Sequence, residues 1–175
     1  RGRVVDGDQI LYVCGVYLNK HGRLSGGTVV PTIASNFGLI KSLELAGLSA
    51  VTSGVGDRHV YAKMREGGYS LGGEQTGHTI FGDIERTGDG IMTSLRVMLS
   101  QLTAPCKLLP QAQVAVRVAD KDAALENMGV QNAIAEAEAA LAGEGRVLVR
   151  KSGTESVIRV LAEAPDQASA DAAMK

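Results

Sequence analysis

The first hundred residues alternate between short apolar runs and stretches in which apolar side chains recur at helical spacing. Apolar residues three and four positions apart predict a first helix over about 7–20, which Asp6 and Gln9 begin as a capping box. The other patterns predict strands over 28–33, 48–53, 69–71 and 79–81, and helices over about 36–46, 57–66 and 87–101. This alternation is typical of an α/β sheet domain, which we place at residues 6–101.

Beyond residue 101 the order of the predicted elements changes. Pro105 and Pro110 indicate a linker over 102–110. The elements that follow are a half-buried strand over 112–118, a helix that ends at Gly143, strands over 146–149 and 157–162, and a helix from about Asp166. This order predicts a small α+β domain over 111–175, with an antiparallel sheet and helices on one face.

Composition limits the classes of protein to which the chain can belong. Of its 175 residues, 45% are hydrophobic but only 3% are aromatic, so the core must consist of aliphatic side chains. A formal net charge of −1 argues against a general nucleic-acid or anionic-membrane surface, and no apolar run has the length of a membrane span. Cys14 and Cys106 lie far apart in apolar surroundings, which predicts reduced, buried thiols of a cytoplasmic protein.

The polar loop between the strands at 146–149 and 157–162 has the composition of an anion-binding turn. Its tip, Ser152-Gly153-Thr154, offers two hydroxyls, and its glycine allows backbone N–H groups to approach a ligand closely. A nucleophilic serine needs a base and an oxyanion site, but no histidine lies near Ser152 and no Gly-x-Ser-x-Gly pattern surrounds it. We therefore interpret Ser152 as a phosphate ligand.

Two arginines flank this loop. If the strands pair simply around residues 151–156, Arg150 lies opposite Val157, and Arg159 shares the face of Arg150 because side chains alternate along a strand. Two guanidiniums beside such a turn can bind a phosphate group bidentately. An ordinary polar turn with two solvated arginines is the alternative interpretation.

A glycine-rich turn leads into the helix predicted at 57–66, with the sequence Ser-Gly-Val-Gly-Asp-Arg. A dinucleotide-binding fingerprint needs a glycine where His59 stands, so the motif is weak evidence for a nucleotide. Such a turn at a helix N-terminus still favours an anion. Alternatively, Asp57 only caps the helix and Arg58 is solvated.

A second glycine-rich loop, Gly-Gly-Glu-Gln-Thr-Gly-His over 72–78, follows a predicted strand. The carboxylate of Glu74 can accept hydrogen bonds from two adjacent sugar hydroxyls, and Gln75 and Thr76 add polar contacts. His78 can donate, accept or carry a proton near neutral pH. Composition alone favours a plain glycine-rich loop.

Both loops resemble motifs of the α-D-phosphohexomutases. The run 150–155, followed by Ile158-Arg159-Val160, resembles the phosphate-binding loop in the last domain of that family. The run 72–78 resembles the family's sugar-binding loop, in the Gly-Glu-Gln version of the bacterial branch that acts on glucosamine phosphates. The resemblance covers nearly the whole chain as the third and fourth domains of the family, with residues 1–5 as the tail of a preceding domain.

The resemblance implies an isomerase that interconverts glucosamine 6-phosphate and glucosamine 1-phosphate through a phosphoserine and a bisphosphate intermediate, and so feeds UDP-N-acetylglucosamine and cell-wall synthesis. It implies that 74–78 hold the sugar, with His78 as a candidate for proton transfer. It also implies that Arg150, Ser152, Gly153, Thr154 and Arg159 hold the phosphate that does not react. The Val-Gly-Asp-Arg turn at 55–58 resembles a turn that faces the substrate cleft in the same branch, which makes Gly56, Asp57 and Arg58 candidate substrate contacts. A phosphomannomutase or phosphoglucomutase, and a phosphosugar-binding module without catalysis, are the alternatives.

The resemblance further implies Mg²⁺, with its ligands in the preceding domain. The run Asp6-Gly7-Asp8 suggests a metal loop, but N-capping already explains Asp6, and the family's metal loop is a longer Asp-Gly-Asp-x-Asp-Arg run that this chain lacks. The family's phosphoserine also lies in another domain. We therefore expect these 175 residues to bind a phosphosugar without turnover, to bind neither nucleic acid nor membrane, and to contain no metal ligands. The oligomeric state stays open.

Overall fold

The structure is a computed structural model in which residues 4–100 and 106–174 are described. The chain divides into two units, unit 1 over Arg1–Leu108 and unit 2 over Leu109–Lys175. The predicted tail at 1–5, the predicted linker at 102–110 and the predicted helix end at 101 lie partly or wholly outside the described residues.

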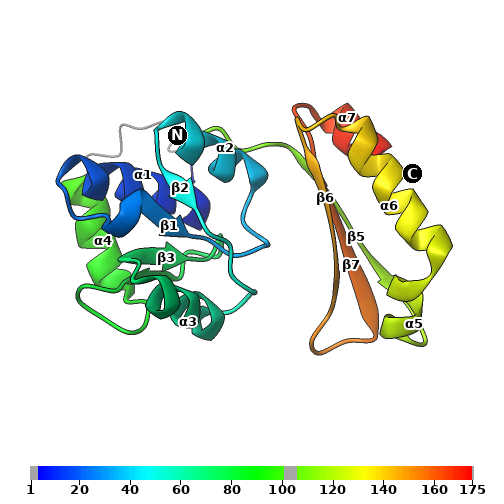
Figure 1. Cartoon of the computed structure of the whole chain (residues 1–175), viewed down its shortest axis with the longest axis horizontal. Coiled ribbons are helices and arrows are strands. Elements are labelled where there is room, and N and C mark those ends of the chain that lie inside the picture. Colours follow the sequence, from blue (N-terminus) through cyan, green and yellow to red (C-terminus); the bar gives the residue numbers. More distant parts are fainter. Residues whose placement is uncertain (1–3, 101–105, 175) are drawn as a thin grey trace. The chain divides into compact units, whose positions relative to one another are not determined.

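Unit 1 is an α/β unit with a mixed sheet of strand order β2-β1-β3-β4 (Figure 1). Strand β1 is parallel to β2 and β3, whereas β4 is antiparallel to β3. The elements are α1 (Gly7–Lys20), the 3-10 turn η1 (Ser25–Gly27), β1 (Thr28–Val30), α2 (Phe37–Leu45), β2 (Ser49–Ala50), α3 (Asp57–Gly67), β3 (Leu71–Gly73), β4 (Thr79–Phe81) and α4 (Gly90–Leu99).

Local sequence signals account for the helix ends of this unit. The capping box is present at α1, where Asp6 Oδ1 accepts from Gln9 N–H at 2.9 Å and Gln9 Oε1 accepts from Asp6 N–H at 3.3 Å. Asn36 and Asp89 cap α2 and α4 through their side chains. Gly68, with a φ of 67°, ends α3 in the left-handed conformation that glycine adopts without strain.

Strands β1 and β2 are shorter than the sequence predicts, β3 begins two residues later than predicted, and β4 has the predicted bounds. Strand β1 ends at Val30 because Pro31 has no N–H for the ladder, and only an isolated bridge joins Thr32 to Ser53 further on. The third strand starts at Leu71 and not at residue 69, because the N–H of Tyr69 donates to Met64 O at 2.8 Å and thereby closes the end of α3.

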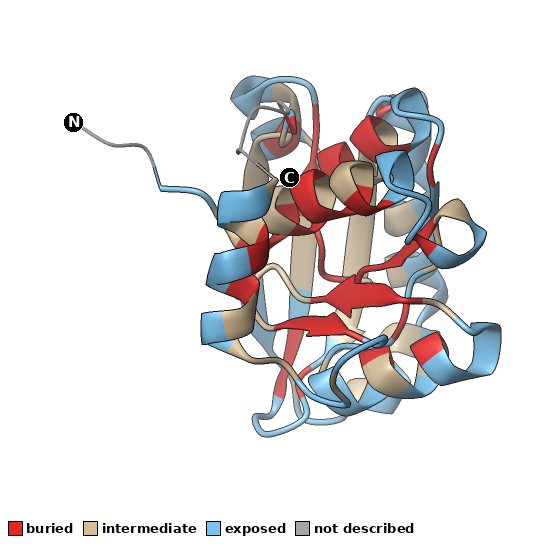
Figure 2. Cartoon of the chain, turned by 90° about the vertical axis from the view of Figure 1, so that its left-hand side faces the viewer, coloured by how far each residue is buried: buried red, intermediate tan, exposed pale blue. Residues whose placement is uncertain are grey.

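The core of unit 1 lies on both faces of the sheet. Strands β1, β3 and β4 are buried throughout (Figure 2). Helices α1, α2 and α4 cover one face, where Leu11, Leu39 and Leu71 are fully buried, and α3 covers the other face through Val60 and Met64. The unit is therefore a three-layer α/β/α arrangement, as the alternation of strands and helices predicts.

Unit 2 has a three-stranded antiparallel sheet of order β5-β7-β6 with helices on one face, which confirms the predicted α+β class. Its elements are β5 (Gln111–Arg117), α5 (Lys121–Glu126), α6 (Met128–Ala140), β6 (Arg146–Lys151), β7 (Val157–Glu163) and α7 (Gln167–Ala172). The sequence predicts one helix before Gly143, but the structure has two. Asn127 separates them because its backbone is extended while its side chain caps α6 by accepting from Gly129 and Val130 N–H.

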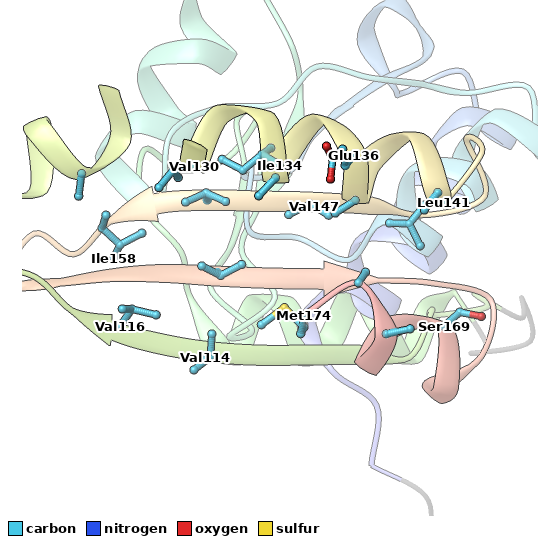
Figure 3. A pocket seen from close by; sticks show the side chains of 18 of the residues that line it. Val114, Val116, Val130, Ile134, Glu136, Leu141, Val147, Ile158, Ser169 and Met174 are labelled. Carbon is cyan, nitrogen blue, oxygen red and sulfur yellow. The ribbon is translucent and has the colours of Figure 1, made fainter. Parts of the chain in front are cut away.

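The apolar side chains of unit 2 line a cavity. This cavity of about 750 Å³ lies between the sheet and helices α6 and α7, and valines of all three strands line it (Figure 3). Val114 and Val116 are each 46% exposed, whereas the tightly packed part is a small cluster of Leu141, Ala164 and Ala170. Unit 2 is thus much less densely packed than unit 1.

Candidate functional site

The loop at 74–78 is the tip of the β3–β4 hairpin in unit 1. Glu74 N–H donates to His78 O at 2.9 Å, and Gly77 N–H donates to Glu74 O at 3.0 Å. Gly77 has a φ of 98°, a conformation that favours glycine. Thr76 is exposed at the tip, whereas Glu74, Gln75 and His78 are half-buried. The loop therefore has a fixed backbone and presents polar groups of different exposure.

The N-terminus of α1 packs directly against this loop. Gly7 N–H donates to Gln75 O at 3.0 Å, and a Cβ atom at Gly7 would lie 2.2 Å from Glu74 O. Only glycine fits there. This contact and the capping box account for the Asp6-Gly7-Asp8 run, since Asp8 is buried and accepts from Asn36 N–H at 2.7 Å. Nothing in the sequence pattern indicates that Gly7 touches a loop almost seventy residues further along the chain.

The turn before α3 contacts the same loop through Glu74. Gly56 N–H donates to Glu74 Oε1 at 3.0 Å, and Gly56, with a φ of 114°, is the N-cap of α3. Among the described residues, Glu74 Oε2 accepts no hydrogen bond. One carboxylate oxygen is therefore used to fix the side chain, and the other stays available as an acceptor.

His78 lies between two elements. Its Nε2 accepts from Gly88 N–H at 3.1 Å and lies 3.8 Å from Asp57 Oδ2. A Cβ atom at Gly88 would lie 2.7 Å from Nε2, so the ring lies directly on that glycine. With Nε2 as the acceptor, the neutral ring carries its proton on Nδ1. The structure thus brings together Gly56, Asp57, Glu74 and His78, all of which the sequence analysis selects, and adds Gly88.

Arg58 is not part of this cluster. Arg58 is exposed in the first turn of α3, and its N–H donates to Asp57 Oδ1 at 2.7 Å. Gly56 is the N-cap and Asp57 is the first helical residue, so Asp57 does not occupy the cap position that the alternative gives it, whereas Arg58 is exposed as that alternative expects.

The hairpin of unit 2 pairs in a different register from the simple one. Arg150 lies directly opposite Arg159, and not opposite Val157, because the innermost pair is Lys151 with Ile158 and the turn is therefore displaced by one residue along the chain. The valines of β6 and β7 that line the cavity face the helices. Side chains alternate along a strand, so both arginines project from the opposite face of the sheet. The prediction that they share a face is confirmed.

The backbone of this loop is partly internally bonded and partly open. Ser152 N–H donates to Val157 O at 3.0 Å, and the buried Ser152 Oγ accepts from Glu155 N–H at 3.3 Å. Within the described part of the chain, the N–H groups of Gly153 and Thr154 donate to no acceptor. A Cβ atom at Gly153 would meet nothing within 4 Å, and its φ lies outside the left-handed region. Neither packing nor conformation requires a glycine there.

Some charged side chains around the loop have an ion-pair partner and Arg150 does not, among the residues that the structure describes. Arg159 donates to Glu155 Oε2 at 2.6 Å, and Lys151 forms an ion pair with Asp122. Among the residues that the structure describes, the guanidinium of Arg150 has neither a hydrogen bond nor an ion pair. One cation at the base of the loop is therefore without an anion.

The sequence analysis missed Lys121. Its ammonium donates to Ser152 O at 2.9 Å and to Glu155 O at 3.2 Å, so α5 contacts the loop from behind. The sequence contains no signal for this contact, because α5 was not predicted and Lys121 belongs to no motif.

The described residues do not fit a metal site. No group of three or more histidine, cysteine, aspartate or glutamate side chains in 4–100 and 106–174 could hold an ion. Both cysteines are free and buried, and burial raises the pKa of each thiol to about 11. No helix in the part of the chain that the structure describes is both long and apolar enough to cross a bilayer.

Known proteins share this sequence and this fold. A phosphoglucosamine mutase from Geobacillus thermodenitrificans is 51% identical over 176 residues, which are 95% of this chain and 39% of that protein. The phosphoglucosamine mutase of Levilactobacillus brevis is 50% identical over 175 residues, with the same shares. The chain thus spans 39% of the length of these relatives.

A solved structure of Aspergillus fumigatus N-acetylphosphoglucosamine mutase, in complex with GlcNAc-6P and magnesium, has the same fold. Its TM-score is 0.79 at 22% identity, over 98% of this chain and 46% of that one. The family model of phosphoglucomutase/phosphomannomutase alpha/beta/alpha domain III matches residues 6–108, and the model of the C-terminal domain matches residues 114–174. The chain therefore belongs to the phosphoglucomutase/phosphomannomutase family, the phosphohexomutases, of which it contains domain III and the C-terminal domain.

Proposed function

We propose that the chain is the sugar- and phosphate-binding part of a phosphoglucosamine mutase. Such an enzyme interconverts glucosamine 6-phosphate and glucosamine 1-phosphate through a phosphoserine and a bisphosphate intermediate, and supplies the precursor of UDP-N-acetylglucosamine for the cell wall. The names of relatives at about half identity support this reaction. The phosphoserine and the ligands of Mg²⁺ belong to the preceding part of the protein. The two free thiols fit the reducing conditions of the cytoplasm.

The pairing of Arg150 with Arg159 is the observation that carries the phosphate assignment. Like charges directly opposite each other on neighbouring strands destabilise a sheet. An anion between them removes that penalty, and a phosphate presents oxygens that match two guanidinium forks. Gly153 also supports the phosphate assignment. Neither packing nor backbone conformation requires a glycine there, and the absence of a side chain leaves the outer side of the loop open for a ligand.

The remaining loop residues complete the phosphate site. The open N–H groups of Gly153 and Thr154, together with the Thr154 and Ser152 hydroxyls, supply donors to the phosphate oxygens. Arg159 must exchange its contact with Glu155 for the phosphate when the ligand binds. We expect its net contribution to be smaller than that of Arg150, because it gives up one anion for another.

The loop at 74–78 holds the hydroxyl side of the sugar in this proposal. Glu74 Oε2 accepts from a hydroxyl while Oε1 stays on Gly56 N–H, and Gln75 and Thr76 add contacts at the exposed tip. His78 uses Nε2 to hold Gly88, so it meets the ligand, or transfers a proton, through Nδ1. Arg58, beside Gly56 and Asp57, adds a positive charge at the same loop.

A double-mutant cycle on binding tests the phosphate assignment. Arg150→Ala should weaken the binding of glucosamine 6-phosphate to the 175-residue chain by about 2–3 kcal/mol, the range for losing a charged hydrogen-bond partner. Arg159→Ala should cost about 1 kcal/mol because the side chain is half-exposed. The two losses should be non-additive, since both side chains bind one phosphate. Isothermal titration calorimetry measures each affinity.

Two controls make the cycle decisive. Arg65→Ala removes an exposed guanidinium from α3 and should leave the affinity unchanged. Arg150→Lys should restore only part of the loss, because an ammonium lacks the planar fork. Strict additivity of the two alanine substitutions, or full rescue by lysine, would show that the arginines do not share a phosphate.

A further inference from the structure

Lys121 contacts the loop at 152–156 from the side of the helices. It is the first residue of α5 and directly follows Asp120, whose carboxylate caps that helix. Its ammonium bridges Ser152 O at 2.9 Å and Glu155 O at 3.2 Å. A single side chain with a fixed origin thus binds the carbonyls at both ends of the loop tip.

These two contacts determine the direction of two N–H groups. The described peptide bonds are trans, and in a trans peptide the carbonyl and the following N–H point to opposite sides. With Ser152 O on Lys121, the N–H of Gly153 points away from α5, and with Glu155 O on Lys121, the N–H of Ser156 does the same. Neither N–H has an acceptor in the described residues.

The side away from the helices is also the side of the arginines. Arg150 and Arg159 project from the sheet face opposite the cavity, whereas Lys121 approaches from the helix side. The outward N–H groups and the two guanidiniums therefore converge on one side of the loop, which is the arrangement of an anion-binding nest.

We propose that Lys121 is the positioning residue of this loop: by binding Ser152 O and Glu155 O it turns the N–H groups of Gly153 and Ser156 toward the phosphate that Arg150 and Arg159 bind. This inference rests on the proposed function of the hairpin, and it adds Ser156 N–H as a ligand. Lys121 does not touch the phosphate itself, because it lies on the opposite side of the loop.

A second lysine on the same loop separates position from charge. Lys151 carries the same charge as Lys121 but pairs with Asp122 and binds no loop carbonyl. If Lys121 acts only through its charge, Lys121→Met and Lys151→Met should weaken phosphate binding equally. If Lys121 positions the loop, only Lys121→Met should weaken phosphate binding.

The test is a titration of the ¹⁵N-labelled 175-residue chain with inorganic phosphate, followed by the amide signals. In the unsubstituted chain, phosphate should shift the Gly153 and Ser156 amides. Lys121→Met should weaken phosphate binding by about 10-fold, as expected when two preorganised donors are no longer aimed at the anion, and should abolish those two shifts. Lys121→Arg can donate to both carbonyls and should recover most of the affinity, while Lys151→Met should change it by less than about 2-fold at physiological salt.

The same spectra report every contrary outcome. Unchanged affinity and unchanged Gly153 and Ser156 shifts in Lys121→Met would overturn this inference and leave the proposed function standing. Equal losses in Lys121→Met and Lys151→Met would reduce Lys121 to a charge, and disappearance of the β5–β7 amide signals in Lys121→Met would make it a structural residue. Absence of any phosphate response in the unsubstituted chain would overturn the proposed function, and this inference with it.

Discussion

The two candidate loops of this chain are held in place by different kinds of contact. In unit 1 the loop at 74–78 is fixed by backbone groups of glycines, namely Gly7, Gly56 and Gly88. In unit 2 the loop at 152–156 is fixed by a charged side chain, Lys121. Gly7 and Gly88 leave no room for a side chain and Gly56 has a positive φ, whereas a lysine bridge can be weakened gradually by competing water and salt.

The cores beneath the two loops differ in the same direction. Unit 1 has fully buried aliphatic residues on both faces of its sheet, whereas the valines of unit 2 border a cavity of about 750 Å³. A dense core transmits a local change to the site above it, and an open one absorbs it. We therefore expect substitutions to damage the loop of unit 1 through the fold, and the loop of unit 2 through its electrostatics.

Matched core truncations should show this contrast most strongly. Leu39→Ala, at a fully buried position of unit 1, should lower the free energy of unfolding by about 3–5 kcal/mol because it leaves a cavity in a dense core. Val114→Ala, at a position 46% exposed in unit 2, should cost less than about 1 kcal/mol. Urea titrations followed by the amide signals of each unit measure both values. Similar costs would mean that the cores are equally packed.

A glycine substitution tests the backbone contact under the unit 1 loop. Gly7→Ala should destabilise unit 1 by about 3 kcal/mol, the upper end of the cost of overpacking, because backbone atoms of Glu74 and Gly77 block its Cβ. The control is Gly90→Ala at the start of α4, where nothing lies within 4 Å, and it should give a gain of up to about 1 kcal/mol. Thermal melts compare the variants. Equal behaviour would refute the close approach of α1 to the loop.

The reactivity of the two cysteine thiols tests how densely unit 1 is packed. Burial raises the pKa of Cys14 and Cys106 from 9.0 to about 11, so at pH 8 each thiolate population should be about 100-fold smaller than in the unfolded chain. Because the folded pKa is raised, the contribution of each thiol to stability is complete below pH 9.0 and is lost as the pH rises toward about 11. Iodoacetamide labelling with and without urea measures the difference. Fast labelling in the folded state would contradict the dense core.

The sequence carries the information for those features that depend on local signals. The helical spacing of α1 and the Asp6–Gln9 capping box predict that helix correctly, because propensity, cap and burial agree. Alternation along β6 and β7 predicts that Arg150 and Arg159 share a face, since the pattern fixes the face and a shift of two residues preserves it. The motifs likewise select most residues that gather around Glu74.

Features that depend on contacts between residues far apart in the sequence could not be predicted. The register of the hairpin follows from the position of the turn, and moving the turn by one residue along the chain places Arg159 opposite Arg150. Gly7 and Gly88 belong to the site only because the fold brings α1 and the turn before α4 to the loop at 74–78. Lys121 contacts a loop thirty residues away through a helix that was not predicted. No periodicity or spacing encodes such contacts.

The most direct test of the account is a comparison of three ligands by chemical-shift mapping on the unsubstituted chain. The central claim is that the loop of unit 2 binds a phosphate group and that the loop of unit 1 binds sugar hydroxyl groups. Inorganic phosphate should shift amide signals of 150–159 and leave 74–78 unchanged, glucosamine should at most shift 74–78, and glucosamine 6-phosphate should shift both sets. Shifts from inorganic phosphate at 74–78 without any at 150–159 would contradict the claim.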